Sequence, residues 1–207
     1  MLVDTGCKGQ ADQILKALRT YNIRPGQIKL ILHTHIHPDH CGSTVTLANE
    51  LQAPTLIHRF EYESLKSGIV RGLIAHNWEG ILAKPVVLQW GINSFKPDYQ
   101  MQADVLSLAD FGLNATAYLT PGHTAGSISI VDHQTNEAIV GDVVMGGYLF
   151  NWIRKSKPRF HFFIQDRQMI RWSMKRLLKL GLSSWYPGHG SGLAVSDVKS
   201  TFVDFLT

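Results

Sequence analysis

His33-Thr34-His35-Ile36-His37-Pro38-Asp39-His40 places four histidines and one aspartate within eight positions. The apolar run at 28–32 precedes this segment and predicts a buried strand that ends where the histidines begin. Imidazoles and carboxylates are good zinc ligands, and imidazoles crowded this closely would otherwise leave buried nitrogens without partners. The segment therefore predicts a metal site at the end of a strand.

The spacing within this segment suggests two neighbouring ions. Residues two apart in an extended chain point the same way, so His35 and His37 can share one ion. Pro38 then turns the chain, because its ring fixes its own φ and restricts the residue before it. Asp39 and His40 can therefore reach a second ion beside the first.

Further segments combine a predicted strand with a glycine turn or a metal-binding side chain. They are Val3-Asp4-Thr5-Gly6, Thr120-Pro121-Gly122-His123-Thr124-Ala125-Gly126-Ser127, Gly141-Asp142 and Tyr186-Pro187-Gly188-His189-Gly190. Together with the histidine cluster they resemble the motifs of the metallo-β-lactamase superfamily, in the order that the family has them. The resemblance extends from residue 3 to residue 190, and five ordered motifs are a specific signal.

The resemblance implies an α/β fold, the four-layer αββα sandwich, here lacking the family's first N-terminal strands. It also implies the ligands. His35, His37 and His123 would bind the first ion, Asp39, His40 and His189 the second, and Asp142 would bridge the two. Asp4 would accept a hydrogen bond from a ligand imidazole and fix its tautomer. The expected cofactors are two Zn²⁺ ions, with iron or manganese as alternatives.

The expected activity is hydrolysis in which a hydroxide between two metal ions attacks an ester, thioester, lactone or amide of a small molecule. Asp39 and Asp142 are the expected catalytic carboxylates, Asp39 orienting the hydroxide. Three alternatives stay open: a phosphodiesterase or nuclease, a β-lactamase, and a sulfur dioxygenase with a single iron. The aromatic segment at 146–163 supplies candidate pocket residues, namely Tyr148, Trp152 and His161.

Charge gives limited information about partners. The 207 residues carry a formal charge of +4, and nine bases lie between Arg154 and Lys179 against one acid, Asp166. A solvated helix face explains this stretch better than a nucleic-acid interface does, so a small-molecule substrate is favoured. The exposed sheet edge left by missing strands favours a homodimer.

Length and hydropathy predict one domain covering residues 1–207. No apolar stretch approaches the roughly 18 residues of a membrane span, and the start shows no secretory signal. If Met1 is the natural start, a cytoplasmic location follows. Cys7 and Cys41 are expected to be reduced thiols.

Local patterns predict the remaining elements. Helices are expected at 11–21, 42–51, 166–180 and 195–206. Strands are expected at 55–57, 86–88, 104–108, 115–120, 127–131, 138–140 and 184–186, and a loop at 146–163.

Overall fold

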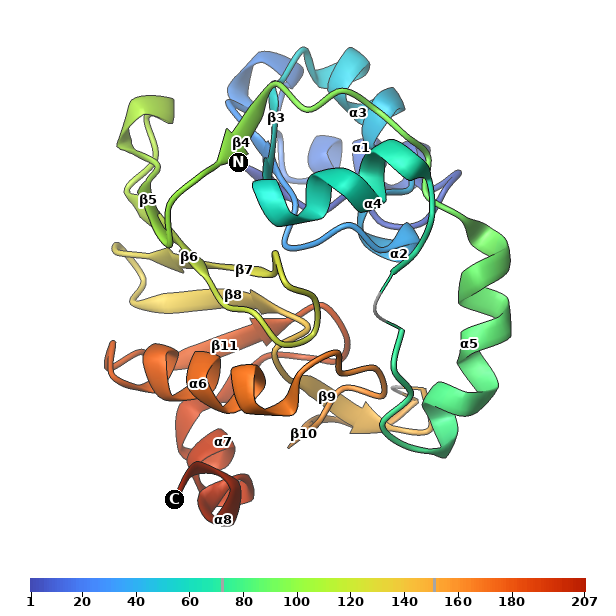
Figure 1. Cartoon of the computed structure of the whole chain (residues 1–207). Coiled ribbons are helices and arrows are strands. Elements are labelled where there is room, and N and C mark those ends of the chain that lie inside the picture. Colours follow the sequence, from blue (N-terminus) through green and yellow to red (C-terminus); the bar gives the residue numbers. More distant parts are fainter. Residues whose placement is uncertain (72, 151) are drawn as a thin grey trace.

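The computed structural model describes residues 1–71, 73–150 and 152–207 and arranges the strands in two sheets and one hairpin (Figure 1). The first sheet is parallel, in the order β1-β2-β3-β4: β1 Leu2–Val3, β2 Ile31–Leu32, β3 Thr55–His58 and β4 Tyr99–Met101. The second has the order β12-β11-β8-β7-β6-β5: β5 Val105–Ser107, β6 Ala115–Leu119, β7 Ile128–Asp132, β8 Glu137–Gly141, β11 Ser184–Pro187 and β12 Leu193–Ala194. The hairpin pairs β9 Met145–Tyr148 with β10 Ile153–Arg159.

The two sheets face each other across an apolar layer. Successive side chains of a strand point to opposite faces, so Leu32 and Ile130 lie in the layer between the sheets, whereas Ile31 and Val131 lie on the outer faces. The inner layer also contains Leu56 of the first sheet.

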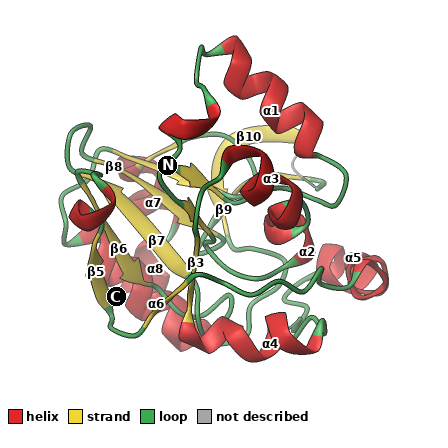
Figure 2. Cartoon of the chain, turned by 90° about the horizontal axis from the view of Figure 1, so that it is seen from above, coloured by secondary structure: helices red, strands yellow, loops and turns green. Residues whose placement is uncertain are grey.

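Helices cover both outer faces. α1 Ala11–Thr20 and α3 Thr44–Leu51 pack on the first sheet through Ala11, Leu47 and Leu51. α6 Arg167–Leu178, α7 Val195–Thr201 and α8 Val203–Leu206 lie on the side of the second sheet, where Met174 and Trp185 are buried. The expected four-layer αββα sandwich is confirmed (Figure 1; Figure 2).

Three further helices lie on the side of the histidine cluster: α2 Pro38–Cys41, α4 Tyr62–Ser67 and α5 Trp78–Trp90. Both views place α5 at the edge of the molecule (Figure 1; Figure 2). Short 3₁₀ turns occupy Pro25–Gln27, Arg59–Glu61 and Ala109–Phe111.

The prediction of a strand at 86–88 is wrong, because these residues belong to α5. Two valines suggest a strand, but the Asn77 side chain accepts a hydrogen bond from the Gly80 backbone N at 3.1 Å and begins a helix upstream. Ala83 and Val87 then pack against a buried cluster that includes Phe163. Capping and packing together outweigh the local β preference.

The prediction of a loop at 146–163 is also wrong in part, because this segment contains most of β9 and all of β10. Within β10 only Pro158 is buried, so the segment lacks the alternation that marks a strand in a sequence. Position 151 of the expected loop lies outside the described residues. Among the described residues no helix combines the length and hydropathy needed to cross a bilayer.

Candidate metal centre

The candidate ligands follow strands of both sheets. His35, His37, Asp39 and His40 come after β2, His123 after β6, Asp142 directly after β8 and His189 after β11. The strands β8 and β11 are parallel neighbours, and the Gly188 backbone N donates to the Gly141 carbonyl at 2.9 Å. Asp142 and His189 therefore leave adjacent strands at the same edge.

A first group of three imidazoles converges on one point. His37 Nδ1 lies 3.1 Å from His35 Nε2 and 3.0 Å from His123 Nε2. All three side chains are buried. The His123 ring is oriented by the Phe163 carbonyl, 2.9 Å from His123 Nδ1, which leaves His123 Nε2 free to face the group.

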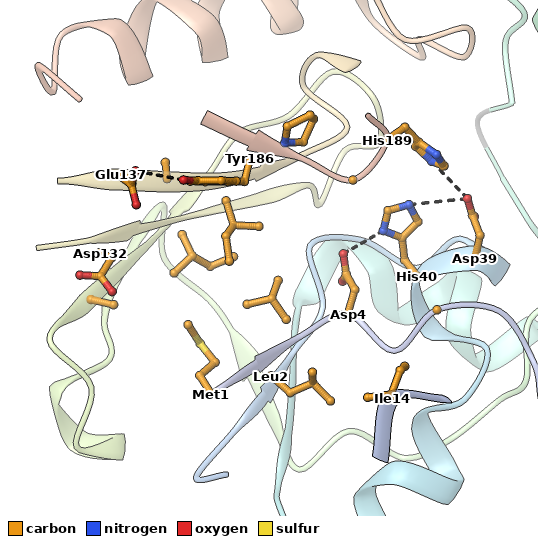
Figure 3. A pocket seen from close by; sticks show the side chains of 18 of the residues that line it. Met1, Leu2, Asp4, Ile14, Asp39, His40, Asp132, Glu137, Tyr186 and His189 are labelled. Carbon is orange, nitrogen blue, oxygen red and sulfur yellow. Dashed lines mark hydrogen bonds and ion pairs between the residues drawn. The ribbon is translucent and has the colours of Figure 1, made fainter. Parts of the chain in front are cut away.

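A second group lies beside the first. Asp39 Oδ2 lies 3.2 Å from His189 Nε2 and 3.7 Å from His40 Nε2. Asp4 orients the His40 ring through the nitrogen that does not face Asp39: Asp4 Oδ2 is 2.8 Å from His40 Nδ1. The Asp4 carboxylate also accepts a hydrogen bond from the Thr34 backbone N at 2.7 Å. Figure 3 shows the contacts of Asp4, His40, Asp39 and His189.

Asp142 joins the two groups. Its Oδ2 lies 3.4 Å from His123 Nε2 and 3.7 Å from His35 Nε2 in the first group, and 3.5 Å from both His40 Nε2 and His189 Nε2 in the second. The carboxylate is thus shared by two sets of nitrogen donors.

These distances fit bound metal ions. Zn–N bonds of about 2.0–2.1 Å place tetrahedral ligand atoms about 3.3 Å apart, close to the separations observed in both groups. In the part of the chain that the structure describes, the buried His40 Nε2 and Asp142 Oδ1 have no hydrogen-bond partner. Buried polar atoms without partners are costly, and a divalent ion between them removes that cost. The donor set therefore suits a pair of divalent ions.

The ionisation of the two groups differs in the metal-free protein. Burial lowers the pKa of His37 and of His123 to about 4, so both are neutral at pH 7. Burial also lowers the pKa of His189, but the negative charges of Asp142 and Asp39 outweigh it and raise that pKa to about 10. Burial raises the pKa of Asp142, but the positive charges of His189 and His40 outweigh burial and hold that pKa well below its usual range.

Two residues at the centre, His161 and Glu61, make contacts that no sequence motif predicts. His161, a pocket candidate, lies 3.3 Å through Nε2 from Asp142 Oδ2, and its ring stands 4.5 Å from that of His123. Glu61 is buried and accepts from the backbone N atoms of Ile36 and Gly126, both at 2.9 Å. Glu61 thereby connects the segment that carries His35 and His37 to the loop that carries His123.

A cavity of ≈ 450 Å³ adjoins the centre and is lined by His161 but by neither of the other two pocket candidates. Tyr148 stacks under Arg159, and Trp152 is 83% exposed. A second hollow of ≈ 840 Å³ lies on the other side, between β1 and the second sheet, and reaches Asp39, His40 and His189 (Figure 3).

Two sets of buried or half-buried donors around a shared carboxylate, at one edge of an αββα sandwich, define a metallo-hydrolase. The chain belongs to the metallo-beta-lactamase superfamily, whose family model matches residues 1–194.

Individual relatives agree with this assignment. The chain is similar to a protein named a probable metallo-hydrolase from Methanocaldococcus jannaschii, with 28% identity over 193 residues, 92% of this chain and 82% of the relative. It is 26% identical over 152 residues to the hydroxyacylglutathione hydrolase GloC of Haemophilus influenzae, covering 70% of this chain and 61% of the relative. A solved structure, TTHA1623 in a di-iron-bound form, shares the fold with a TM-score of 0.66 and 20% identity over 96% of this chain and 85% of that one.

Proposed function

We propose that this protein hydrolyses an ester or thioester of a small molecule with two divalent metal ions, most simply zinc. The observation that carries the proposal is the position of Asp142 Oδ2 between the two groups of nitrogen donors. His35, His37 and His123 would hold one ion, Asp39, His40 and His189 the other, and Asp142 both. Such ions, when bound, make water a nucleophile near neutral pH and polarise the carbonyl under attack.

The chain's own residues supply orientation and charge. Burial raises the pKa of Asp39, but the positive charges of His40 and His189 outweigh burial and hold that pKa below its usual range. Asp39 therefore stays ionised and can accept a hydrogen bond from the attacking water. Asp4 fixes the tautomer of His40 by accepting from its Nδ1.

The similarity to a hydroxyacylglutathione hydrolase supports an acyl thioester or a related ester over the lactone and amide alternatives. The basic stretch supports the phosphodiesterase alternative less well, because part of it is engaged within the fold. Arg159 pairs with the buried Glu79, Arg167 stacks over Phe160, and Arg176 donates to the Leu119 carbonyl. The bases exposed on β10 are Arg154, Lys155 and Lys157.

Metal stoichiometry followed by a substrate panel tests the proposal. Purified protein is expected to contain two zinc ions per chain and to cleave chromogenic esters and thioesters. His37→Ala and Asp142→Ala are expected to lose metal and turnover while keeping the far-UV circular dichroism of the parent. A single iron per chain with oxygen consumption would instead indicate the dioxygenase, and cleavage restricted to lactam or phosphodiester substrates would contradict the ester proposal.

A further inference from the structure

The cavity of ≈ 450 Å³ opens directly onto the candidate metal ligands. Its floor is formed by His37, Asp39, Asp142, His161 and His189. Its walls are formed by Leu82, Ala83, Val86, Val87 and Trp90 of α5 together with Phe150, Phe162 and Phe163. The volume falls within the roughly 300–1,000 Å³ typical of small-molecule sites.

Among the described residues, the walls carry no charge. Each ionisable side chain that lines the cavity there belongs to the floor, and no described Lys, Arg or further acid lines the walls. Burying a charged or strongly polar group there would cost free energy without a partner to offset it. The walls therefore select an uncharged, apolar part of a substrate, held within reach of the centre.

One stripe of α5 faces this cavity. Leu82, Val86 and Trp90 follow each other at a spacing of four, which aligns them on one side of a helix. They are 61%, 48% and 52% exposed, so their apolar surface is open to a ligand in the cavity. Contiguous exposed apolar side chains are a feature of ligand-binding grooves, and those of this stripe line the cavity.

The wall is held in place at the beginning of α5. The buried Glu79 accepts from the Phe150 backbone N at 3.0 Å and pairs with Arg159. Gly80 lies so close to the Phe162 carbonyl that a Cβ would collide with it. These contacts join three parts of the wall, so the cavity is formed before a substrate arrives.

We infer that this cavity binds an aliphatic acyl chain, so that the substrate is an ester or thioester of a medium-chain carboxylic acid. The inference rests on the proposed hydrolase function and names its substrate class. Water adds its oxygen to the acyl carbon, the C–S or C–O bond to the leaving group breaks, and the leaving group takes up a proton. The acid remains as the carboxylate with its chain along α5.

A homologous series of thioesters with one common leaving group and acyl chains from acetyl to decanoyl tests this inference. Each methylene buried contributes about 0.8 kcal/mol, equivalent to roughly fourfold in kcat/KM. We expect kcat/KM to rise by about that factor per methylene until the cavity is filled. A profile that is flat, or that falls from acetyl onwards, in an enzyme that cleaves acetyl thioester would overturn the acyl site but not the hydrolase.

Paired substitutions on α5 provide the matched control. Leu82→Ser with Val86→Ser changes two cavity-lining residues, 61% and 48% exposed. Ile81→Ser with Leu88→Ser changes two residues of the same helix that are equally exposed, 66% and 48%, but do not line the cavity. The first pair is expected to lower the octanoyl-to-acetyl ratio of kcat/KM at least tenfold, whereas the second pair leaves it within twofold. Equal effects of both pairs would contradict the inference.

Binding of the product acids gives a readout that does not depend on turnover. Calorimetry with butyrate, hexanoate, octanoate and decanoate on the metal-loaded protein is expected to show affinity and a negative heat-capacity change that both grow with chain length. Absence of turnover with all thioesters, together with this trend, would contradict the proposed function and leave the apolar site standing. Absence of the trend would overturn the site.

Discussion

Gly188 lies against the carboxylate of Asp142: a Cβ on Gly188 would stand 2.5 Å from Asp142 Oδ1 and 2.6 Å from His40 Cε1. We therefore expect Gly188→Ala to displace Asp142 and His40 and to lower metal content, measured by mass spectrometry of the purified protein. Gly26→Ala is the control, since a Cβ at Gly26 would meet no atom of the described residues within 4 Å. Equal metal content in both variants would show that the fit at Gly188 does not matter.

Glu61 connects two ligand-bearing segments through two buried backbone N–H groups. Each unpaired buried donor costs about 1–3 kcal/mol, so Glu61→Ala is expected to lower the free energy of unfolding by at least about 2 kcal/mol in urea denaturation. Glu61→Gln keeps one acceptor oxygen and should lose about half as much. Glu63→Ala changes an exposed acid two positions away and should stay within about 0.5 kcal/mol of the parent.

Asp4 contacts the second group directly, through His40. It reaches the first group only indirectly, through the Thr34 hydroxyl, which lies 2.8 Å from Asp4 Oδ2 and 3.0 Å from His35 Nδ1. Loss of such a contact typically reduces metal affinity by about 10–100-fold. Asp4 has φ of 59°, a left-handed conformation that Asn also tolerates, so Asp4→Asn removes the charge without a backbone penalty. Competition with a chelator should show a larger loss of affinity for the zinc of the second group than for the zinc of the first group. An equal loss at both sites would contradict this assignment.

Metal binding is expected to release protons from the second group. In the metal-free protein the pKa of His189 is about 10, so a bound ion must displace its proton at pH 7. His37 and His123, with pKa values of about 4, have none to release. As pH falls from 8 to 6, the affinity of the second site should drop about tenfold per unit for each proton released, while the first site is unaffected. Calorimetry of zinc binding in buffers of different ionisation enthalpy measures the protons, and zero release would refute the prediction.

The local patterns of the sequence were informative where one face of an element is buried. Ile31 and Leu32 lead into the histidines as expected, and Met174 and Leu177 of α6 lie on its buried face. The motifs around His123, Asp142 and His189 are each short and local, so their convergence could be anticipated from the family resemblance. The roles of the converged residues stay predictions until metal is measured.

The features that could not be predicted from the sequence depend on contacts between segments that are distant along the chain. Nothing near Glu61 reveals that its carboxylate reaches Gly126, 65 positions away. The place of His161 beside Asp142 requires the reversal made by β9 and β10, and exposed β10 gives no alternating pattern. The valines at 86 and 87 suggest a strand in isolation, and only the capping by Asn77 and contacts with the cluster around Phe163 make them helical.

The division of the ligands between the two sheets has a mechanical consequence. His35 and His37 extend from the first sheet, whereas His123, Asp142 and His189 extend from the second. Ions bound by ligands of both sheets would cross-link the two sheets at the edge of the sandwich, where the apolar layer between the sheets ends. Separation of the two sheets would then require release of the ions. Resistance to proteases and the cooperativity of unfolding should therefore depend on the concentration of available metal.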